Sequence, residues 1–143
     1  MALPGETEKN GYNCVAGRIR MLNRIVTSIY DEALAPLHLK ISQLSVLGAL
    51  NRRGRAGACE LCAILKMDKS TVSRNVERMA RRGWLSVKRD KGSRTHLVGL
   101  TAKGTKLLRD AYPLWLKAQQ EAARRLGDEG LTALGTLTQK LGD

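Results

Sequence analysis

Thirteen lysines and arginines lie between Arg52 and Arg94 against four acidic residues, so this segment carries +9 of the chain's net charge of +12. The residues before it contribute +1 and those after it +2. A cluster of guanidinium and ammonium groups neutralises phosphates and releases counterions, which is the chemistry of nucleic-acid binding. An anionic lipid surface would instead require a basic helix with a broad apolar face. Turn and strand patterns interrupt this segment, so we expect nucleic acid as the partner and no membrane.

The cysteines are the other residues whose spacing could support chemistry. Cys59 and Cys62 form a Cys-x-x-Cys pair, the spacing of redox pairs and of half a zinc site. Zinc needs two further ligands, and Cys14, His38 and His96 are scattered without ligand spacing, so we expect no metal and no cofactor. Cys62 also suits a small apolar position in a short helix. Packing is therefore the favoured interpretation of the pair, with a redox role as the alternative, and Cys14 is a further redox candidate.

Several classes of protein are disfavoured by what the sequence lacks. No Gly-rich phosphate loop, nucleophile elbow or cluster of metal ligands is present, so we expect no enzyme. No apolar run approaches the roughly 18 residues of a membrane span. Three cysteines are an odd number, which argues against a disulfide framework. The chain is therefore expected to be a cytoplasmic, folded protein of one compact subunit.

The segments before the basic region read as helices. Apolar residues recur at helical spacing over 15–37, and the pattern ends near Pro36. Ser42 is the expected N-cap of a second helix that runs to about Asn51, and a short third helix is expected from Ala58 to Leu65. These helices would need partner surfaces for their apolar faces.

A fourth helix follows, with Asp68 as its N-cap and Gly83 at its end. Its apolar and polar residues separate onto opposite faces. The apolar face carries Val72, Val76 and Met79, and the polar face carries Ser70, Arg74, Glu77, Arg78 and Arg81. One face should pack and the other should be presented to a partner.

The remaining segments read as a hairpin and two helices. Residues 84–88 and 95–100 have the types of short strands, and the basic tip 89–94 joins them. Thr101 should cap a long helix, with a kink expected between Arg109 and Pro113. A last helix should begin near Asp128, with leucines in a narrow seam that resembles a helix-pairing surface: Leu131, Leu134, Leu137 and Leu141.

This order predicts a mainly α fold with a small β-hairpin wing, in the α+β class. The third and fourth helices fit a helix-turn-helix, whose second helix enters the major groove, and the basic hairpin would be its wing. We expect residues 38–100 to form this winged helix-turn-helix lobe. Residues 1–37 and 101–143 would form the dimerisation helices.

The motifs along the chain resemble those of the MarR family. They are Tyr30-Asp31-Glu32, Gln43, Glu60-Leu61-Cys62, the run from Met67 to Arg74, Arg82-Gly83-Trp84-Leu85, Arg89-Asp90, Arg94 and the run from Leu100 to Gly104. The resemblance covers most of the chain. It implies a homodimer with intertwined terminal helices that binds a pseudo-palindromic operator and represses nearby genes until a small ligand or oxidant releases it.

The resemblance also implies roles for particular residues. Ser70, Thr71 and Arg74 match recognition-helix contacts, although helix capping is an alternative for Ser70 and Thr71. Arg94 matches the wing-tip arginine, with Arg89 as the alternative. Family wings often carry a second aspartate just before that arginine, whereas this chain has Gly92 and Ser93. The full set of candidate DNA contacts is Lys69, Ser70, Thr71, Arg74, Asn75, Arg78, Arg89 and Arg94.

The family's effector cleft is bounded by the first, second and fifth helices. Arg20, Tyr30, Tyr112 and Trp115 are candidates to line it, with core packing as the alternative for the aromatic residues. Cys14 lies where peroxide-sensing relatives carry a reactive cysteine. The predicted function is a sequence-specific DNA-binding transcriptional regulator. The alternative is an architectural protein that binds nucleic acid without sequence specificity.

Overall fold

The computed structural model describes residues 14–142, and these fall into two compact units. Residues 34–116 form the central unit, and residues 14–33 and 117–142 form the terminal unit. The central unit therefore keeps the first part of the last long helix, which the sequence pattern had grouped with the chain ends. A dimerisation role for the ends is a separate matter and stays a prediction.

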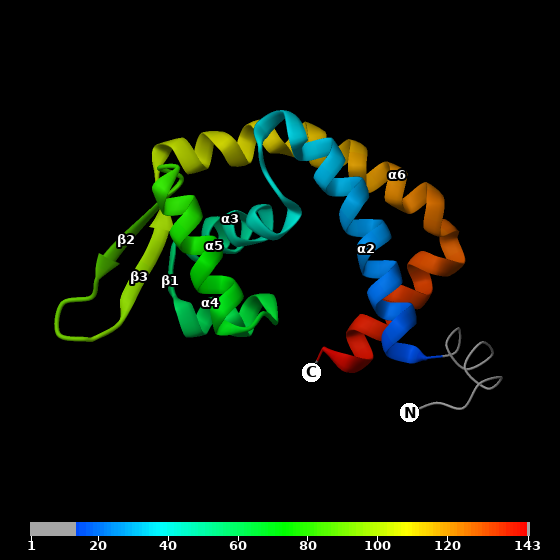
Figure 1. Ribbon diagram of the computed structural model, residues 1–143, viewed down its shortest axis with the longest axis horizontal. Helices are drawn as coiled ribbons and strands as arrows, with labels where there is room; N and C mark the ends of the chain where they lie inside the picture. The colour runs from blue at the N-terminus through cyan, green and yellow to red at the C-terminus, as the bar shows by residue number, and fades with distance from the viewer. Residues whose placement is uncertain (1–13, 143) are drawn as a thin grey trace, which may run out of the picture. The chain divides into compact units, whose positions relative to one another are not determined.

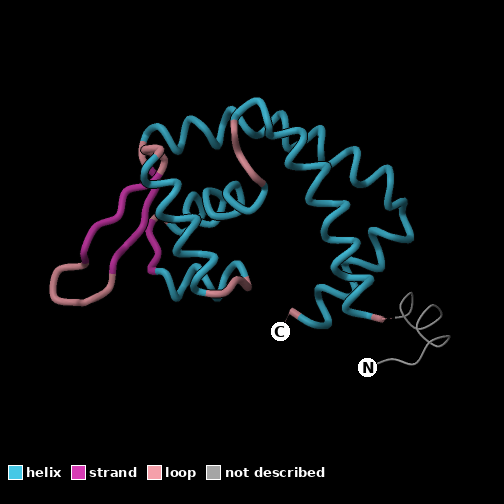
Figure 2. Tube along the Cα trace, viewed as in Figure 1, coloured by secondary structure: helices cyan, strands magenta, loops and turns pink. Residues whose placement is uncertain are grey.

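The central unit holds a cluster of helices and a small antiparallel sheet (Figures 1 and 2). Its strands pair in the order β1-β3-β2. Val98 of the central strand β3 lies opposite Ala56 of β1 on one side and opposite Val87 of β2 on the other. The expected α+β fold with a hairpin wing is confirmed. Its elements are η1 (Ala35–Leu37), α3 (Ile41–Arg53), β1 (Arg55–Gly57), α4 (Ala58–Leu65), α5 (Lys69–Arg81), β2 (Leu85–Arg89), β3 (His96–Leu100) and the start of α6 (Ala102–Leu141).

The start of α3 differs from the prediction. The helix begins at Ile41 with Lys40 as its N-cap residue, so the predicted N-cap at Ser42 is wrong. Gln43 explains the earlier start, because its side-chain Oε1 accepts the backbone N–H of Lys40 at 3.0 Å. A glutamine three residues into a helix thus satisfies a backbone donor that a capping hydroxyl cannot reach.

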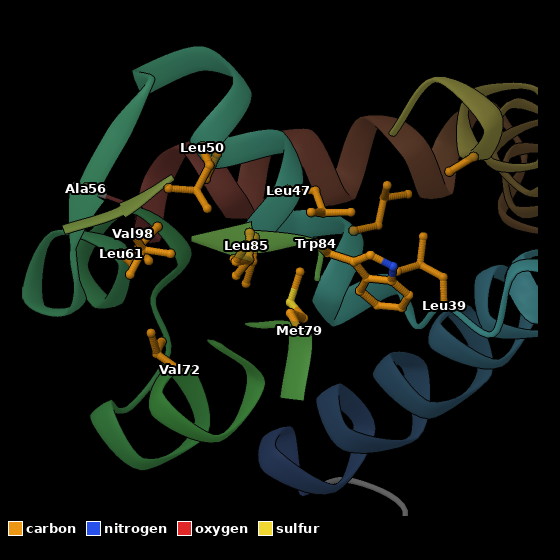
Figure 3. Packing of buried hydrophobic residues seen from close by; sticks show 14 of the residues in the cluster. Leu39, Leu47, Leu50, Ala56, Leu61, Val72, Met79, Trp84, Leu85 and Val98 are labelled. Carbon is orange, nitrogen blue, oxygen red and sulfur yellow. The ribbon is translucent and has the colours of Figure 1, made fainter. Parts of the chain in front are cut away.

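The core of the central unit joins all its elements (Figure 3). Trp84 lies near Met79 and Leu39 in this view, and Leu61 lies near Val98 of the sheet. Apolar side chains removed from water in this way supply the main stabilising free energy of a small fold. The fully buried large side chains are Leu34, Leu39, Val46, Leu47, Leu50, Leu61, Val72 and Met79.

The first turn of α6 is fastened to the turn that ends α5. Thr101 Oγ1 donates to the carbonyl of Gly83 at 2.6 Å and accepts the backbone N–H of Gly104 at 3.0 Å, which confirms the predicted cap. A Cβ on Gly104 would lie 2.1 Å from the carbonyl oxygen of Trp84. Only glycine therefore permits this approach of helix and turn.

Helix α6 is interrupted at Gly127, where the backbone takes φ 67° and ψ 174°. The dihedral angles leave the helical region inside α6 at Gly127, and the kink expected between Arg109 and Pro113 stays a prediction. Glycine carries no Cβ, so it adopts this positive φ at little cost. The last helical segment then begins at Asp128, as predicted.

The terminal unit consists of α2 (Val15–Leu34) and the later part of α6. Ile29 packs with Ala118 and Ala122, and the Tyr30 hydroxyl donates to the side chain of Gln119. Helix α2 ends at Leu34, and the 3-10 turn η1 contains residues 35–37, which were predicted as the end of that helix.

No single helix among residues 14–142 is long and apolar enough to cross a membrane. Only the bent pair of Val15–Leu37 and Ile41–Arg53, taken together, reaches the required length and apolarity.

Candidate nucleic-acid interface

Asp68 fixes the start of α5 through both of its carboxylate oxygens. Oδ1 accepts the backbone N–H of Thr71 at 2.9 Å, and Oδ2 accepts the Thr71 hydroxyl at 2.7 Å. The hydrogen bonds from Thr71 hold the pKa of Asp68 below its usual value. The predicted cap is thus confirmed, and the Thr71 hydroxyl uses its one hydrogen-bond donor on Asp68.

Helix α5 separates into a buried and an exposed face, as predicted. Val72 and Met79 are fully buried, and Val76 packs half-buried against the same core. The opposite face is exposed and mostly basic, and Glu77 pairs there with Arg81. The exposed side chains of this face are Lys69, Ser70, Ser73, Arg74, Glu77, Arg78 and Arg81.

The turn between α4 and α5 depends on one carbonyl. Lys66 adopts a left-handed conformation with φ 51°, and its N–H donates to the carbonyl of Cys62. The N–H of Met67 donates to the same carbonyl at 3.2 Å. Two consecutive donors on one acceptor close α4 in a helix-ending turn. Asp68 follows at once, so the turn delivers the chain directly into the cap of α5.

The other end of α5 is held by Arg82, the residue whose role the sequence did not reveal. Its guanidinium lies 4.8 Å from the ring centroid of Trp84, and Nη1 donates to the carbonyl of His38 at 2.7 Å. Lys103 Nζ donates to the Arg82 carbonyl at 2.9 Å. The Arg82-Gly83-Trp84 motif was a signal of family resemblance only, because the contact with His38 spans 44 residues of sequence.

The wing consists of β2, β3 and the loop 90–95, and it projects beyond the helices of the central unit (Figure 1). The N–H of Asp90 donates to the carbonyl of Thr95 at 3.0 Å, and Gly92 takes a positive φ of 87°. The hydroxyls of Ser93 and Thr95 are hydrogen-bonded to each other at 2.7 Å. The loop is therefore closed by its backbone and hydroxyls, with basic side chains exposed around it: Lys88, Arg89, Lys91 and Arg94.

The predicted contact residues lie on two neighbouring elements of the central unit. Lys69, Ser70, Arg74 and Arg78 are exposed on α5, while Thr71 and Asn75 are half-buried on that helix. The other two, Arg89 and Arg94, are exposed on the wing. Arg94 forms no ion pair within residues 14–142, which agrees with the lack of a second aspartate beside it.

Two of the four predicted effector residues share a pocket of about 520 Å³ within the central unit. Tyr112 and Trp115 stack there, with ring centroids 6.0 Å apart and an interplanar angle of 24°. Arg20 is exposed on α2 and Tyr30 is half-buried, and both belong to the terminal unit. The remaining lining comes from α3, Leu65 and Leu108: Ile41, Leu44, Ser45, Gly48, Asn51 and Arg52.

All three cysteines are free thiols. Cys59 is exposed on the first turn of α4, and Cys62 is half-buried against the core one turn later. Cys14 is exposed immediately before α2. Within residues 14–142, no three His, Cys, Asp or Glu side chains are placed to hold a metal ion.

Comparison with known proteins identifies relatives over most of the chain. The model of the MarR family matches residues 39–94. The HTH-type transcriptional regulator YwoH of Bacillus subtilis is 28% identical over 84% of this chain and 88% of its own. The transcriptional regulator MosR of M. tuberculosis, solved in complex with DNA, is 31% identical and superposes with a TM-score of 0.78, covering 89% of this chain and 95% of that one.

A further solved relative is BpsR of Bordetella bronchiseptica, whose DNA binding is regulated by 6-hydroxynicotinic acid. It is 25% identical, with a TM-score of 0.79 over 90% of this chain and 98% of its own. These similarities extend through the helix-turn-helix, the wing and the terminal helices. The chain belongs to the MarR family of transcriptional regulators.

Proposed function

We propose that the protein is a cytoplasmic, sequence-specific DNA-binding regulator that represses transcription as a homodimer. The observation that carries this proposal is the arrangement of α5. The helix is held at both ends, its apolar face is buried in the core, and its opposite, mostly basic face is exposed. A rigid helix of this kind can enter the major groove and keep its side chains in register with base edges. Lys69, Ser70, Arg74 and Arg78 are the side chains that this face offers to DNA.

Not every predicted contact has the same chemistry available. Arg74 is exposed near the middle of the helix, where a guanidinium can make two parallel hydrogen bonds to a guanine. The Thr71 hydroxyl donates its hydrogen bond to Asp68, so towards DNA it can only accept a hydrogen bond or offer its methyl group. Asn75 is half-buried and would reach DNA only at its amide end.

The wing supplies a second, sequence-independent contact. Arg94 stands exposed on a loop closed by the Asp90–Thr95 backbone hydrogen bond, with Arg89 at the end of β2. In this proposal Arg94 enters the narrow minor groove beside the site of α5, where the negative potential attracts arginine. Arg89 then contacts the phosphate backbone.

Release of the operator would follow from binding of a small ligand in the pocket of Tyr112 and Trp115. The pocket joins α3 to α6 within the central unit and presents stacked aromatic faces beside Arg52 and Asn51. BpsR provides a precedent, since a small aromatic molecule regulates its DNA binding. A ligand acts here only if it binds the released conformation more tightly than the DNA-bound one.

Selection of bound fragments from genomic DNA, followed by footprinting, tests the proposal. We expect a protected inverted repeat with half-sites one helical turn apart, and affinity for it about a thousandfold or more above that for random DNA. Equal affinity for both DNAs would support the alternative of a non-specific architectural protein.

Single arginine variants then separate the roles of α5 and the wing. Arg74→Ala should weaken operator binding by about 1–3 kcal/mol and reduce discrimination at one base pair.

Arg94→Ala should weaken operator binding. If Arg94 contacts a phosphate, the variant should also lower the slope of log affinity against log salt concentration by about one. Arg109→Ala, exposed on α6, is the matched control and should bind like the unmodified chain. If Arg94→Ala binds normally, its assigned role is wrong.

A further inference from the structure

We propose that Cys59 and Cys62 form a dithiol modification site, which closes to a disulfide within α4 and loosens the turn that positions α5. This inference concerns the regulation of the DNA-binding unit and therefore rests in part on the proposed function. Its first half, the disulfide and the change in the turn, can be tested without DNA.

The two cysteines are placed for reaction with each other. They stand three residues apart on a helix of eight residues, so both lie on one side of its first turns. Cys59 is exposed to an incoming reagent, whereas Cys62 is half-buried beside Leu61 of the core. An accessible first thiol with a sheltered second thiol next to it favours an internal disulfide over a lasting mixed one.

The oxidant is a low-molecular-weight disulfide, such as glutathione disulfide. The Cys59 thiolate attacks one of its sulfurs, which forms a mixed disulfide and releases one thiol. The Cys62 thiolate then attacks the Cys59 sulfur, forms the Cys59–Cys62 bond and releases the second thiol. The two cysteines lose two electrons and two protons in total, and the reagent becomes two thiols. No metal or cofactor is needed.

Closure of this bond must deform α4. Residues three apart on a helix have Cβ atoms about 5–6 Å apart, whereas a disulfide holds them at about 3.5–4.5 Å. The start of α4 cannot give way easily, because β1 runs directly into it. Ala56 is fully buried and Gly57 is paired with Leu97 of β3. The movement is therefore passed to the other end of the helix.

That other end is the turn to α5. The Cys62 carbonyl accepts the N–H groups of both Lys66 and Met67, and Lys66 holds a left-handed conformation there. Rotation of Cys62 towards Cys59 tilts this carbonyl away from its two donors. The next residue, Asp68, is the cap of α5. An event at the thiols thus reaches the start of the proposed recognition helix within six residues.

Peptide mapping tests the bond itself. The reduced full-length chain is incubated with glutathione disulfide, alkylated and digested. We expect the peptide containing residues 59–62 to be two hydrogen atoms lighter and unalkylated, in the unmodified chain and in the Cys14→Ser variant alike. A stable mixed disulfide on Cys59, or a disulfide that links two copies, would overturn the proposal.

Hydrogen exchange tests the effect on the turn. In the oxidised chain the amides of Met67, Thr71 and Val72 should exchange about tenfold faster than in the reduced chain. The amides of α3 serve as internal reference. Unchanged exchange over residues 66–72 in a chain with the disulfide would refute the coupling.

DNA binding tests the regulatory consequence. The oxidised chain should bind the operator about tenfold more weakly, and added dithiothreitol should restore the affinity. Cys59→Ser should bind like the reduced chain and ignore the oxidant. Cys62→Ala should stop at the mixed disulfide on Cys59, because the thiol that would resolve it is missing. If the disulfide forms and binding is unchanged, regulation at this site is refuted. If the reduced chain does not distinguish operator from random DNA, the proposed function fails, while the mapping and exchange results still decide the dithiol site.

Discussion

At the residue scale, the start of α5 depends on the two hydrogen bonds between Asp68 and Thr71. Asp68→Ala removes the acceptor of the Thr71 N–H and should lower the melting temperature by several degrees at pH 7. Operator binding should weaken as well, because the first turn of the helix frays. Asp68→Asn is the control, since an asparagine caps nearly as well and does not titrate.

The same carboxylate gives a pH dependence with a definite sign. The Thr71 hydrogen bonds lower the pKa of Asp68 in the folded chain, so the unfolded chain binds the proton more readily. The stabilisation is present above the unfolded value near 3.8 and is lost as the pH falls through the lower folded value. Thermal melts should therefore show the deficit of Asp68→Ala shrink between pH 5 and pH 2. A constant deficit over that range would contradict the assignment.

Arg82 and its neighbour Arg81 provide a matched pair. Arg82→Ala removes the contact with the Trp84 ring and the hydrogen bond to the His38 carbonyl, and should reduce the free energy of unfolding by about 1–2 kcal/mol. Arg81→Ala removes only an exposed pair with Glu77 and should change it by less than about 0.5 kcal/mol. Urea titration measures both. Equal effects would show that the Arg82 contacts add no stability.

At the element scale, the junction of α6 with the α5–β2 turn leaves no room for a side chain. Gly104→Ala would drive its Cβ into the Trp84 carbonyl, whose position is fixed by the N–H of Thr101 at 3.1 Å. We expect a loss of about 2–3 kcal/mol in the free energy of unfolding. Gly135→Ala is the control on the same helix, with no atom within 4 Å of the new methyl group, and should be neutral or stabilising by up to about 1 kcal/mol. If both variants unfold alike, the close approach at Gly104 is not a constraint.

The elements that the sequence predicted well are those whose signals are local. The bounds of α4 and the cap of α5 follow from residues next to them in sequence, and both agree with the structure. Strand β1 escaped prediction because Arg-Ala-Gly has no strand pattern, and only its pairing with β3 makes it a strand. The contact from Arg82 to His38 could not be predicted either, because it joins residues that are distant in sequence. The break at Gly127 agrees with the helix start that the sequence predicted near Asp128, which is again a local signal.

At the scale of the whole molecule, the terminal unit exposes several large apolar side chains. Val15 is 73% exposed and Leu141 is 76% exposed. Large exposed apolar patches mark association surfaces. This surface is the basis for proposing that two copies pair through their chain ends, and its other exposed members are Ile19, Met21, Ile25, Leu131 and Leu137.

Charge introduced on this surface should therefore separate the copies. Ile19→Asp and Leu137→Asp each place a carboxylate where burial against a second copy would leave it unpaired, so each should raise the dimer dissociation constant by about a hundredfold or more. Sedimentation at several concentrations measures the change, and circular dichroism checks that the helices remain. Lys140→Asp, which alters charge at a polar position of the same helix, is the control. Operator affinity should fall when dimerisation is lost, because a single copy contacts one half-site and makes no contact with the second. A variant that stays dimeric at micromolar concentration would place the pairing surface elsewhere on the chain.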